Sequence, residues 1–302
     1  MIKIYIPPVG KEKIGGGWSF LNNFIGGLPA DAMIEPALEE ADVVFLPAST
    51  MVTRDFVQEV RSYGKPIALR IDGVPEDWRN RGTGWSRTKD FAGWANLVIY
   101  QSYFVEKTIG RLLEHTLEKE LNHTVIMNGA DIEVFKLEGE VLHAFGNPSI
   151  LYVNYRKGEH NKRVEEVIER FRYFKLDNPE ATLTFVGNYS KQQFRWNDKS
   201  WDFGMLDLEE GKDWRYLGIV SDREELAKIM RSHEFIAFPS FADPCPNTLI
   251  EALCCGCVPL WVNGYGGASE IIAQWESCVF PGLDFSKERM ALDYVKSFKE
   301  VL

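Results

Sequence analysis

Residues 234–259 read EFIAFPSFADPCPNTLIEALCCGCVP, and this stretch decides the fold class. The apolar run 235–238 predicts a strand, and residues 239–246 predict a turn rich in proline and aspartate. A helix is expected over 247–255, closed by Gly256, and another apolar strand begins at Val258. Strand, turn, helix and strand in this order predict a βαβ unit.

Two carboxylates frame the turn of this unit, Asp243 before the helix and Glu251 on it, with seven residues between them. In βαβ units a ligand binds at the carboxyl end of the strand, where the next helix points its free N–H groups. The positive end of the helix dipole suits a phosphate there, whereas a carboxylate one turn inside the helix suits sugar hydroxyls. The unit therefore predicts a ligand site.

Strand and helix patterns alternate along the rest of the chain. Strands are expected at 2–6, 43–47, 66–71, 97–100, 124–127, 150–153 and 182–186, and helices at 18–25, 56–63, 103–120, 163–174, 223–231 and 285–301. This alternation predicts mainly parallel sheets covered on both faces. Because residues 135–148 lose periodicity, we expect two α/β domains, 1–140 and 141–302, and the last helix could pack back on the first of them.

Composition narrows the class of protein. The 302 residues are 45% hydrophobic and 26% charged, which is typical of a soluble globular protein. The formal net charge of −10 argues against a nucleic-acid partner and mildly against docking to an anionic membrane. No signal peptide and no apolar run of about 20 residues is visible, so we expect a cytoplasmic protein. All five cysteines follow position 240 without paired CxxC units, which indicates reduced buried thiols rather than a metal site.

Other strand ends carry groups that suit a phosphorylated ligand. Arg156 and Lys162 follow the strand at 150–153, and such a cationic pair suits a diphosphate, although either residue alone is more typical of solvated surface. Glycines 15–17 lie between a strand and a helix, where the backbone can approach a phosphate or a sugar; a flexible loop is the alternative. The aromatic segment 188–214 either contacts a substrate or packs on itself as a surface loop.

These motifs together resemble glycosyltransferase family 4, most specifically between Tyr216 and Glu270. The resemblance rests on Asp243, Asn247 and the Glu251-Ala252-Leu253 run, and on Gly15 to Gly17, Asn128 to Asp131, Arg156, Lys162, Gly187, Gly218, Gly266-Gly267 and Glu270 in the expected order. It implies a retaining enzyme of the GT-B fold, which has two Rossmann-like domains with mainly parallel sheets facing a central cleft. Asp243 departs from the family pattern, which usually has Glu at this position.

The resemblance also implies roles for individual residues. It implies catalytic roles for Asp72, Asp243, Arg156 and Lys162, and donor binding by Gly16, Gly17, Arg156, Lys162, Pro246, Asn247, Thr248 and Glu251. Glu251 would hold the donor ribose, and the cationic pair would hold the diphosphate without a metal. Asp72 stands where many members carry a histidine; a turn-capping role before Gly73 is the alternative. Asn128 and Asp131 are expected to fix the turn at the domain junction.

The expected function is transfer of a sugar from a nucleoside-diphosphate sugar, with UDP or GDP, to a hydroxyl of a glycan, protein or small-molecule acceptor. No permanently bound cofactor is expected. Three alternatives stay open: a GT-B epimerase or phosphorylase, a catalytically silent sugar-nucleotide-binding protein, and a dinucleotide-dependent oxidoreductase. The last is argued from glycines 15–17, but the chain has no spaced GxGxxG motif there.

Overall fold

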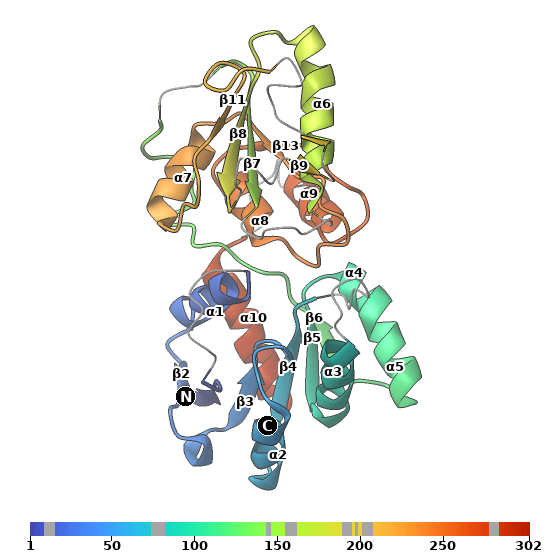
Figure 1. The fold of residues 1–302 in the computed structure, drawn as a ribbon. Coiled ribbons are helices and arrows are strands. Elements are labelled where there is room, and N and C mark those ends of the chain that lie inside the picture. Colours follow the sequence, from blue (N-terminus) through green and yellow to red (C-terminus); the bar gives the residue numbers. More distant parts are fainter. Residues whose placement is uncertain are drawn as a thin grey trace. The chain divides into compact units, whose positions relative to one another are not determined.

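The computed structural model of this chain describes residues 1–8, 16–73, 82–142, 146–154, 162–188, 195–196, 199–200, 208–277 and 284–302 (Figure 1). Arg156, Cys278 and most of the aromatic segment 188–214 lie outside these residues. The chain divides into two compact units. Unit 1 comprises Met1–Ala130, Ala242–Asn247 and Gly266–Leu302, and unit 2 comprises Asp131–Phe241 and Thr248–Tyr265.

Unit 1 contains a six-stranded sheet in the order β2-β1-β3-β4-β5-β6, and every neighbouring pair is parallel. Its strands are β1 (Ile2–Tyr5), β2 (Ala32–Ile34), β3 (Val43–Leu46), β4 (Ile67–Ile71), β5 (Leu97–Tyr100) and β6 (His123–Val125). The central strands β3, β4 and β5 are buried at every position, as continuous apolar runs covered on both faces require. Strand β2 was not predicted, because its three residues are too few to show a period.

The helices of unit 1 are α1 (Gly16–Gly26), α2 (Arg54–Ser62), α3 (Gly82–Trp94), α4 (Tyr103–Val105), α5 (Arg111–Leu117), α9 (Ala268–Ser277) and α10 (Lys287–Lys299). Thr53 caps α2 by accepting a hydrogen bond from the Phe56 amide, and Ser286 caps α10 in the same way through the Arg289 amide. The single helix expected over 103–120 is divided into α4, a π-helical turn at Glu106–Gly110, and α5.

An aromatic cluster joins the C-terminal helix to the first sheet. Helices α1 and α10 lie side by side (Figure 1). Between them and β3, the rings of Phe20, Phe24, Phe45, Tyr294 and Phe298 pack with centroids 5.0–6.3 Å apart. Each of these five side chains is fully buried, so α10 completes the core on this face of the sheet.

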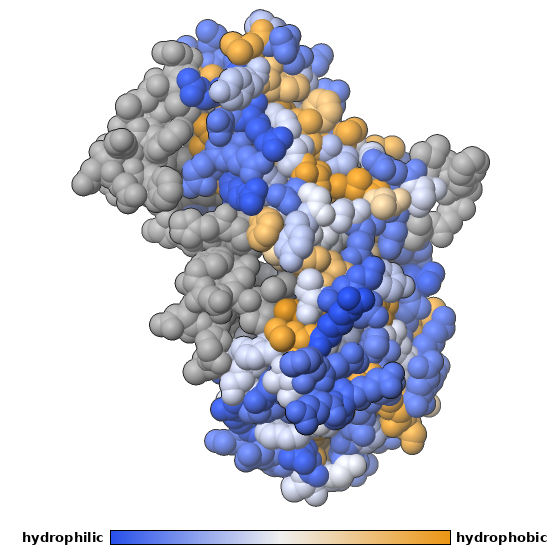
Figure 2. Space-filling view, turned by 90° about the vertical axis from the view of Figure 1, so that its right-hand side faces the viewer, coloured by the Kyte–Doolittle hydropathy of each residue, from blue (hydrophilic) through white to orange (hydrophobic). Residues whose placement is uncertain are grey.

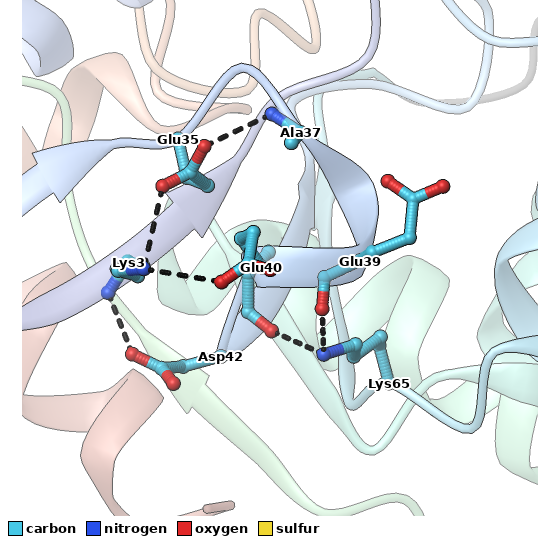
Figure 3. A network of polar contacts seen from close by, with 8 residues as sticks. Lys3, Glu35, Ala37, Glu39, Glu40, Asp42 and Lys65 are labelled. Atoms are coloured by element: carbon cyan, nitrogen blue, oxygen red, sulfur yellow. Dashed lines mark hydrogen bonds and ion pairs between the residues drawn. The ribbon is translucent and has the colours of Figure 1, made fainter.

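A polar network at the edge of this sheet fixes the strand connections (Figure 3). The Lys3 amide donates to the Asp42 carboxylate at 2.8 Å, and the Lys3 ammonium lies 3.6 Å from carboxylate oxygens of Glu35 and Glu40. Lys65 donates to the carbonyl oxygen of Glu39 at 2.7 Å. Partly exposed ion pairs of this kind contribute at most about 1 kcal/mol each.

Unit 2 contains a five-stranded parallel sheet in the order β11-β8-β7-β12-β13. Its strands are β7 (Ser149–Asn154), β8 (Thr182–Gly187), β11 (Trp214–Tyr216), β12 (Phe235–Ala237) and β13 (Val258–Leu260), and its helices are α6 (Val164–Asp177), α7 (Arg223–Arg231) and α8 (Asn247–Cys254). A short antiparallel pair, β9 (Arg195–Trp196) and β10 (Lys199–Ser200), lies apart from this sheet. Trp214, the last aromatic of segment 188–214, is buried at the start of β11 and belongs to the core.

The predicted βαβ unit is present, with β12, α8 and β13 in sequence. Gly256 ends α8 with a φ of +90°, a left-handed conformation that glycine adopts without strain. On the face shown in Figure 2 hydrophilic and hydrophobic residues are interspersed and the hydrophilic ones predominate. Within the described ranges, no helix has both the length and the hydropathy needed to cross a bilayer.

Candidate active site

The turn between β12 and α8 is held by backbone contacts within unit 1. The Gly267 amide donates to the Asp243 carbonyl at 2.8 Å, and the Ser102 hydroxyl donates to the Pro244 carbonyl at 2.7 Å. A Cβ atom at position 267 would overlap the Pro244 carbonyl, so only glycine fits there. The turn that carries Asp243 is therefore held by two contacts: the backbone of Gly267 packs closely against it, and the Ser102 side chain donates a hydrogen bond to it.

Two predicted donor-binding residues, Gly16 and Asn247, are in direct contact. The side-chain nitrogen of Asn247 donates to the Gly16 carbonyl at 3.0 Å, and its side-chain oxygen accepts a hydrogen bond from Asn128 at 2.8 Å. Gly16 is exposed, with no atom within 4 Å of a Cβ placed on it, whereas the same position on Gly17 meets the sulfur of Met51 at 3.4 Å. The first residue of α1 and the first residue of α8 are therefore joined by a hydrogen bond.

A buried arginine is hydrogen-bonded to Asn128, the residue that donates to Asn247. Arg70, near the carboxyl end of β4, is 2% exposed, and its guanidinium donates to the Pro47 carbonyl at 3.0 Å, to Gln101 at 2.8 Å and to Asn128 at 3.2 Å. The ring of Phe20 lies 3.7 Å from the guanidinium carbon. Arg70 was not predicted to have a role, although a charged residue inside the apolar run IALRI is a signal for one.

The second carboxylate of the motif, Glu251, is buried on α8 in unit 2. It is 2% exposed, and its Oε1 atom accepts a hydrogen bond from the Arg223 guanidinium at 2.7 Å. The Arg223 guanidinium also lies 4.4 Å from the centroid of the Phe135 ring. In the described part of the chain, Arg223 is the one residue that bonds this carboxylate. Arg223 was missed because nothing in the sequence links α7 to this position.

Of the predicted cationic pair, Lys162 is described and Arg156 lies outside the described residues. Lys162 is half-buried, and its ammonium lies 5.9 Å from the centroid of the Phe238 ring. The Tyr152 hydroxyl donates to the Lys162 carbonyl at 2.8 Å and fixes the backbone there. The next residue, Arg163, has a φ of +53°, an uncommon conformation for a residue with a side chain.

The other predicted residues lie at strand ends and around the turn. Asp72 is half-buried and directly follows β4. Asp243 and Pro246 are buried, and Thr248 is half-buried in the first turn of α8. Asp243 belongs to unit 1 together with Asn247, whereas Thr248, Glu251 and Lys162 belong to unit 2.

The Glu270 carboxylate has a structural role. Its two oxygens accept hydrogen bonds from the amides of Tyr103 and Phe104, at 2.9 and 2.6 Å. These amides open α4, so Glu270 satisfies free donors at that helix end.

The cysteines around α8 are packed as thiols. Burial raises the pKa of Cys245, Cys255 and Cys257 to about 12, so these side chains stay protonated at neutral pH. Within the ranges that the structure describes, no group of three or more His, Cys, Asp or Glu side chains is arranged to hold a metal ion.

Comparison with known families identifies the chain. Residues 142–292, half of the chain, match the family described as "Glycosyl transferases group 1". The chain belongs to the group 1 glycosyltransferases. The predicted resemblance to glycosyltransferase family 4 is thereby confirmed, and the enzyme transfers a sugar from a nucleotide sugar.

Solved structures place this glycosyltransferase in the GT-B fold, as predicted. Anabaena HepE in complex with UDP and glucose is 13% identical, with a TM-score of 0.68 over 99% of this chain and 100% of that one. Sucrose-phosphate synthase from Thermosynechococcus elongatus is 14% identical, with a TM-score of 0.69 over 100% and 99% of the two chains. The pneumococcal O-GlcNAc transferase GtfA, in complex with UDP and GlcNAc, is 14% identical with a TM-score of 0.58 over 86% of this glycosyltransferase and 56% of that chain. The comparison with curated proteins found no match to the glycosyltransferase.

Proposed function

We propose that the glycosyltransferase is a retaining enzyme that moves a sugar from a nucleoside-diphosphate sugar to an acceptor hydroxyl. The buried carboxylate of Glu251 on α8 carries this proposal. One of its oxygens is engaged by Arg223, which fixes the carboxylate group and leaves Oε2 to accept hydrogen bonds from the ribose hydroxyls of the donor. UDP is the first nucleotide to test, because similar structures contain UDP or UDP-glucose.

The leaving diphosphate carries the charge that the enzyme must stabilise. Lys162 supplies a compact positive charge, and the N-terminus of α8 supplies free N–H groups and the positive end of its dipole. Arg156, outside the described residues, is proposed to complete the cationic pair. These groups stabilise the diphosphate as its bond to the sugar breaks.

The acidic residues are proposed to act on the sugar and the acceptor. Asp243, together with the backbone of 246–248, would hold the transferred sugar and the distal phosphate, and Asp72 would bind the acceptor or stabilise positive charge that develops on the sugar. Gly16 and Gly17 would let the backbone approach the diphosphate or the acceptor. The acceptor hydroxyl then attacks from the face that the diphosphate leaves, which retains the anomeric configuration.

A panel of nucleotide sugars tests this function. Release of nucleoside diphosphate is measured with UDP- and GDP-sugars across candidate acceptors, and the anomeric configuration of the product is read by NMR. Glu251→Gln and Arg156→Ala should each lose most of the turnover while remaining folded. Glu224→Gln, on the exposed side of α7, is the matched control and should retain activity.

Three results would count against the proposal. Full activity in Glu251→Gln would exclude the ribose role. Epimerised donor, or sugar phosphate formed with inorganic phosphate, would identify an epimerase or a phosphorylase instead. Tight donor binding without release of nucleotide to any acceptor would identify a silent binding protein.

A further inference from the structure

A chain of hydrogen bonds connects the buried Arg70 to the Gly16 carbonyl. The Arg70 guanidinium donates to Oδ1 of Asn128 at 3.2 Å, Nδ2 of Asn128 donates to Oδ1 of Asn247 at 2.8 Å, and Nδ2 of Asn247 donates to Gly16 O at 3.0 Å. Gln101 supports the first step, since its Oε1 accepts from both Arg70 and Asn128, at 2.8 and 3.1 Å. All of these residues belong to unit 1.

Arg70 fixes the donor-to-acceptor direction of these hydrogen bonds. A guanidinium group has hydrogen-bond donors only, so Asn128 must turn its oxygen toward Arg70. The amino group of Asn128 then points at three acceptors, the Cys245 carbonyl at 2.9 Å, Oδ1 of Asn247 at 2.8 Å and Oε1 of Gln101 at 3.1 Å. Asn247 in turn presents its amino group to Gly16. Reversing either amide would bring two donors or two acceptors face to face.

Burial makes this orientation costly to change. Arg70, Gln101 and Asn128 are 2%, 3% and 4% exposed, so water cannot replace a lost partner. A buried polar group that loses its partner destabilises the folded state, because no other group satisfies it. Among the residues that the structure describes, no carboxylate forms an ion pair with Arg70. The series of hydrogen bonds therefore begins at a positive charge, which strengthens them.

We propose that Arg70 and Asn128 are positioning residues of the glycosyltransferase. They fix the side-chain amide of Asn247 at the start of α8 and hold the Gly16 carbonyl against it. Within the described residues Nδ2 of Asn247 donates to Gly16 alone, which leaves its second hydrogen for an oxygen of the donor. This inference rests on the proposed function, in which Asn247 and Gly16 contact the nucleotide sugar.

The variant Asn128→Asp separates positioning from folding. Aspartate has nearly the same shape, keeps an oxygen toward Arg70 and gives the buried cation a counter-charge, which offsets part of the hydrogen bonds lost to the Cys245 carbonyl and to Gln101. The thermal midpoint should fall while the protein remains folded, so the KM is compared with wild type at a temperature well below both midpoints. Its second oxygen, however, faces Oδ1 of Asn247, so the Asn247 amide turns round and presents its own oxygen to Gly16. The KM for the donor should rise about tenfold or more, with a smaller change in kcat.

Two further variants make the test decisive if Asn128→Asp folds poorly. Arg70→Lys keeps a cationic donor and should retain most of the donor affinity, whereas Arg70→Met removes the donor that orients Asn128 and should raise the KM. Asn122→Asp, an exposed residue of the same unit, is the matched control and should behave as wild type. Wild-type KM in folded Asn128→Asp, or a loss of activity that only follows the unfolded fraction, would overturn the proposal.

Failure of the proposed function would have a different signature. If the wild type binds and turns over no nucleotide sugar, the proposed function fails, and the hydrogen-bonded chain is then judged by NMR of the side-chain amides. The Asn247 NH2 signals should exchange slowly in wild type and much faster in Asn128→Asp. Identical exchange in the two proteins would overturn the positioning role.

Discussion

The Arg223 guanidinium, in the first turn of α7, donates a 2.7 Å hydrogen bond to the Glu251 carboxylate, which is 2% exposed on α8. A buried carboxylate is stable only when it is paired and hydrogen-bonded. The pair therefore gives the acid of the family motif a hydrogen-bonded cationic partner in the core of unit 2 and fixes the position of its Oε1 atom.

Replacing Arg223 with Met should destabilise the protein by about 2 kcal/mol. Removing one partner of a fully buried ion pair costs about 3–5 kcal/mol, and the cost is smaller here because the Arg223 side chain is 37% exposed. Urea unfolding measures the change. Arg170→Met removes an exposed pair with Glu166 and is the control, with an expected change of at most about 0.5 kcal/mol. Equal stabilities of the two variants would contradict the role of Arg223.

Gly267→Ala should destabilise the turn that carries Asp243. The added Cβ would overlap the Pro244 carbonyl, and a backbone clash of this kind costs about 1–3 kcal/mol when the chain must shift. Thermal unfolding measures the loss. Gly264→Ala is the matched control, because no atom lies within 4 Å of its Cβ position. A Gly267→Ala protein as stable as the control would show that the turn can move freely.

Phe298→Ala should cost about 3–5 kcal/mol of unfolding free energy, because it removes a ring packed against Phe24, Phe45 and Tyr294 and leaves a cavity. Tyr173, 67% exposed on α6, is the control residue, and Tyr173→Ala should change stability by at most about 0.5 kcal/mol. Chemical denaturation compares the two. A small effect of Phe298→Ala would mean that α10 is not needed for the core of unit 1.

The buried His233 should make stability depend on pH. Burial lowers the pKa of His233 from 6.5 to about 4, and its ring nitrogens contact the Ile229 carbonyl at 2.6 Å and the Thr184 hydroxyl at 2.8 Å. Because the unfolded chain takes up the proton first, stability is full above pH 6.5. It falls by about 3 kcal/mol as the pH drops to 4.

Urea unfolding at a series of pH values tests this, with His233→Gln as the comparison. Glutamine does not titrate, so the variant should lose less stability over the same pH range. Parallel curves for the wild type and the variant would rule out His233 as the source of the acid sensitivity.

Much of this fold could be predicted from local patterns. The buried strands β3, β4 and β5 were recognised as apolar runs, and the order β12, α8, β13 was predicted from one stretch of sequence. Other elements escaped prediction: β2 has three residues, the 13 residues of α3 were not assigned to a helix, and the π-helical turn at Glu106–Gly110 interrupts a helix whose pattern looks continuous. Local propensity does not distinguish such a turn from an α-helical one, because π-helical turns are rare and occur inside α-helices.

The alternation of strands and helices and the motif from Asp243 to Glu251, which carries the resemblance to the family, could be recognised from local sequence. They depend on neighbouring residues, through hydrophobic periodicity and turn chemistry. Which side chains meet at the motif depends instead on the folded chain. Asn128 reaches Asn247 across 119 positions, Asn247 reaches Gly16 across 231, and Arg223 reaches Glu251 across 28. Such contacts follow from how parallel strands align their carboxyl ends, and that alignment is a property of the folded sheet rather than of any local segment.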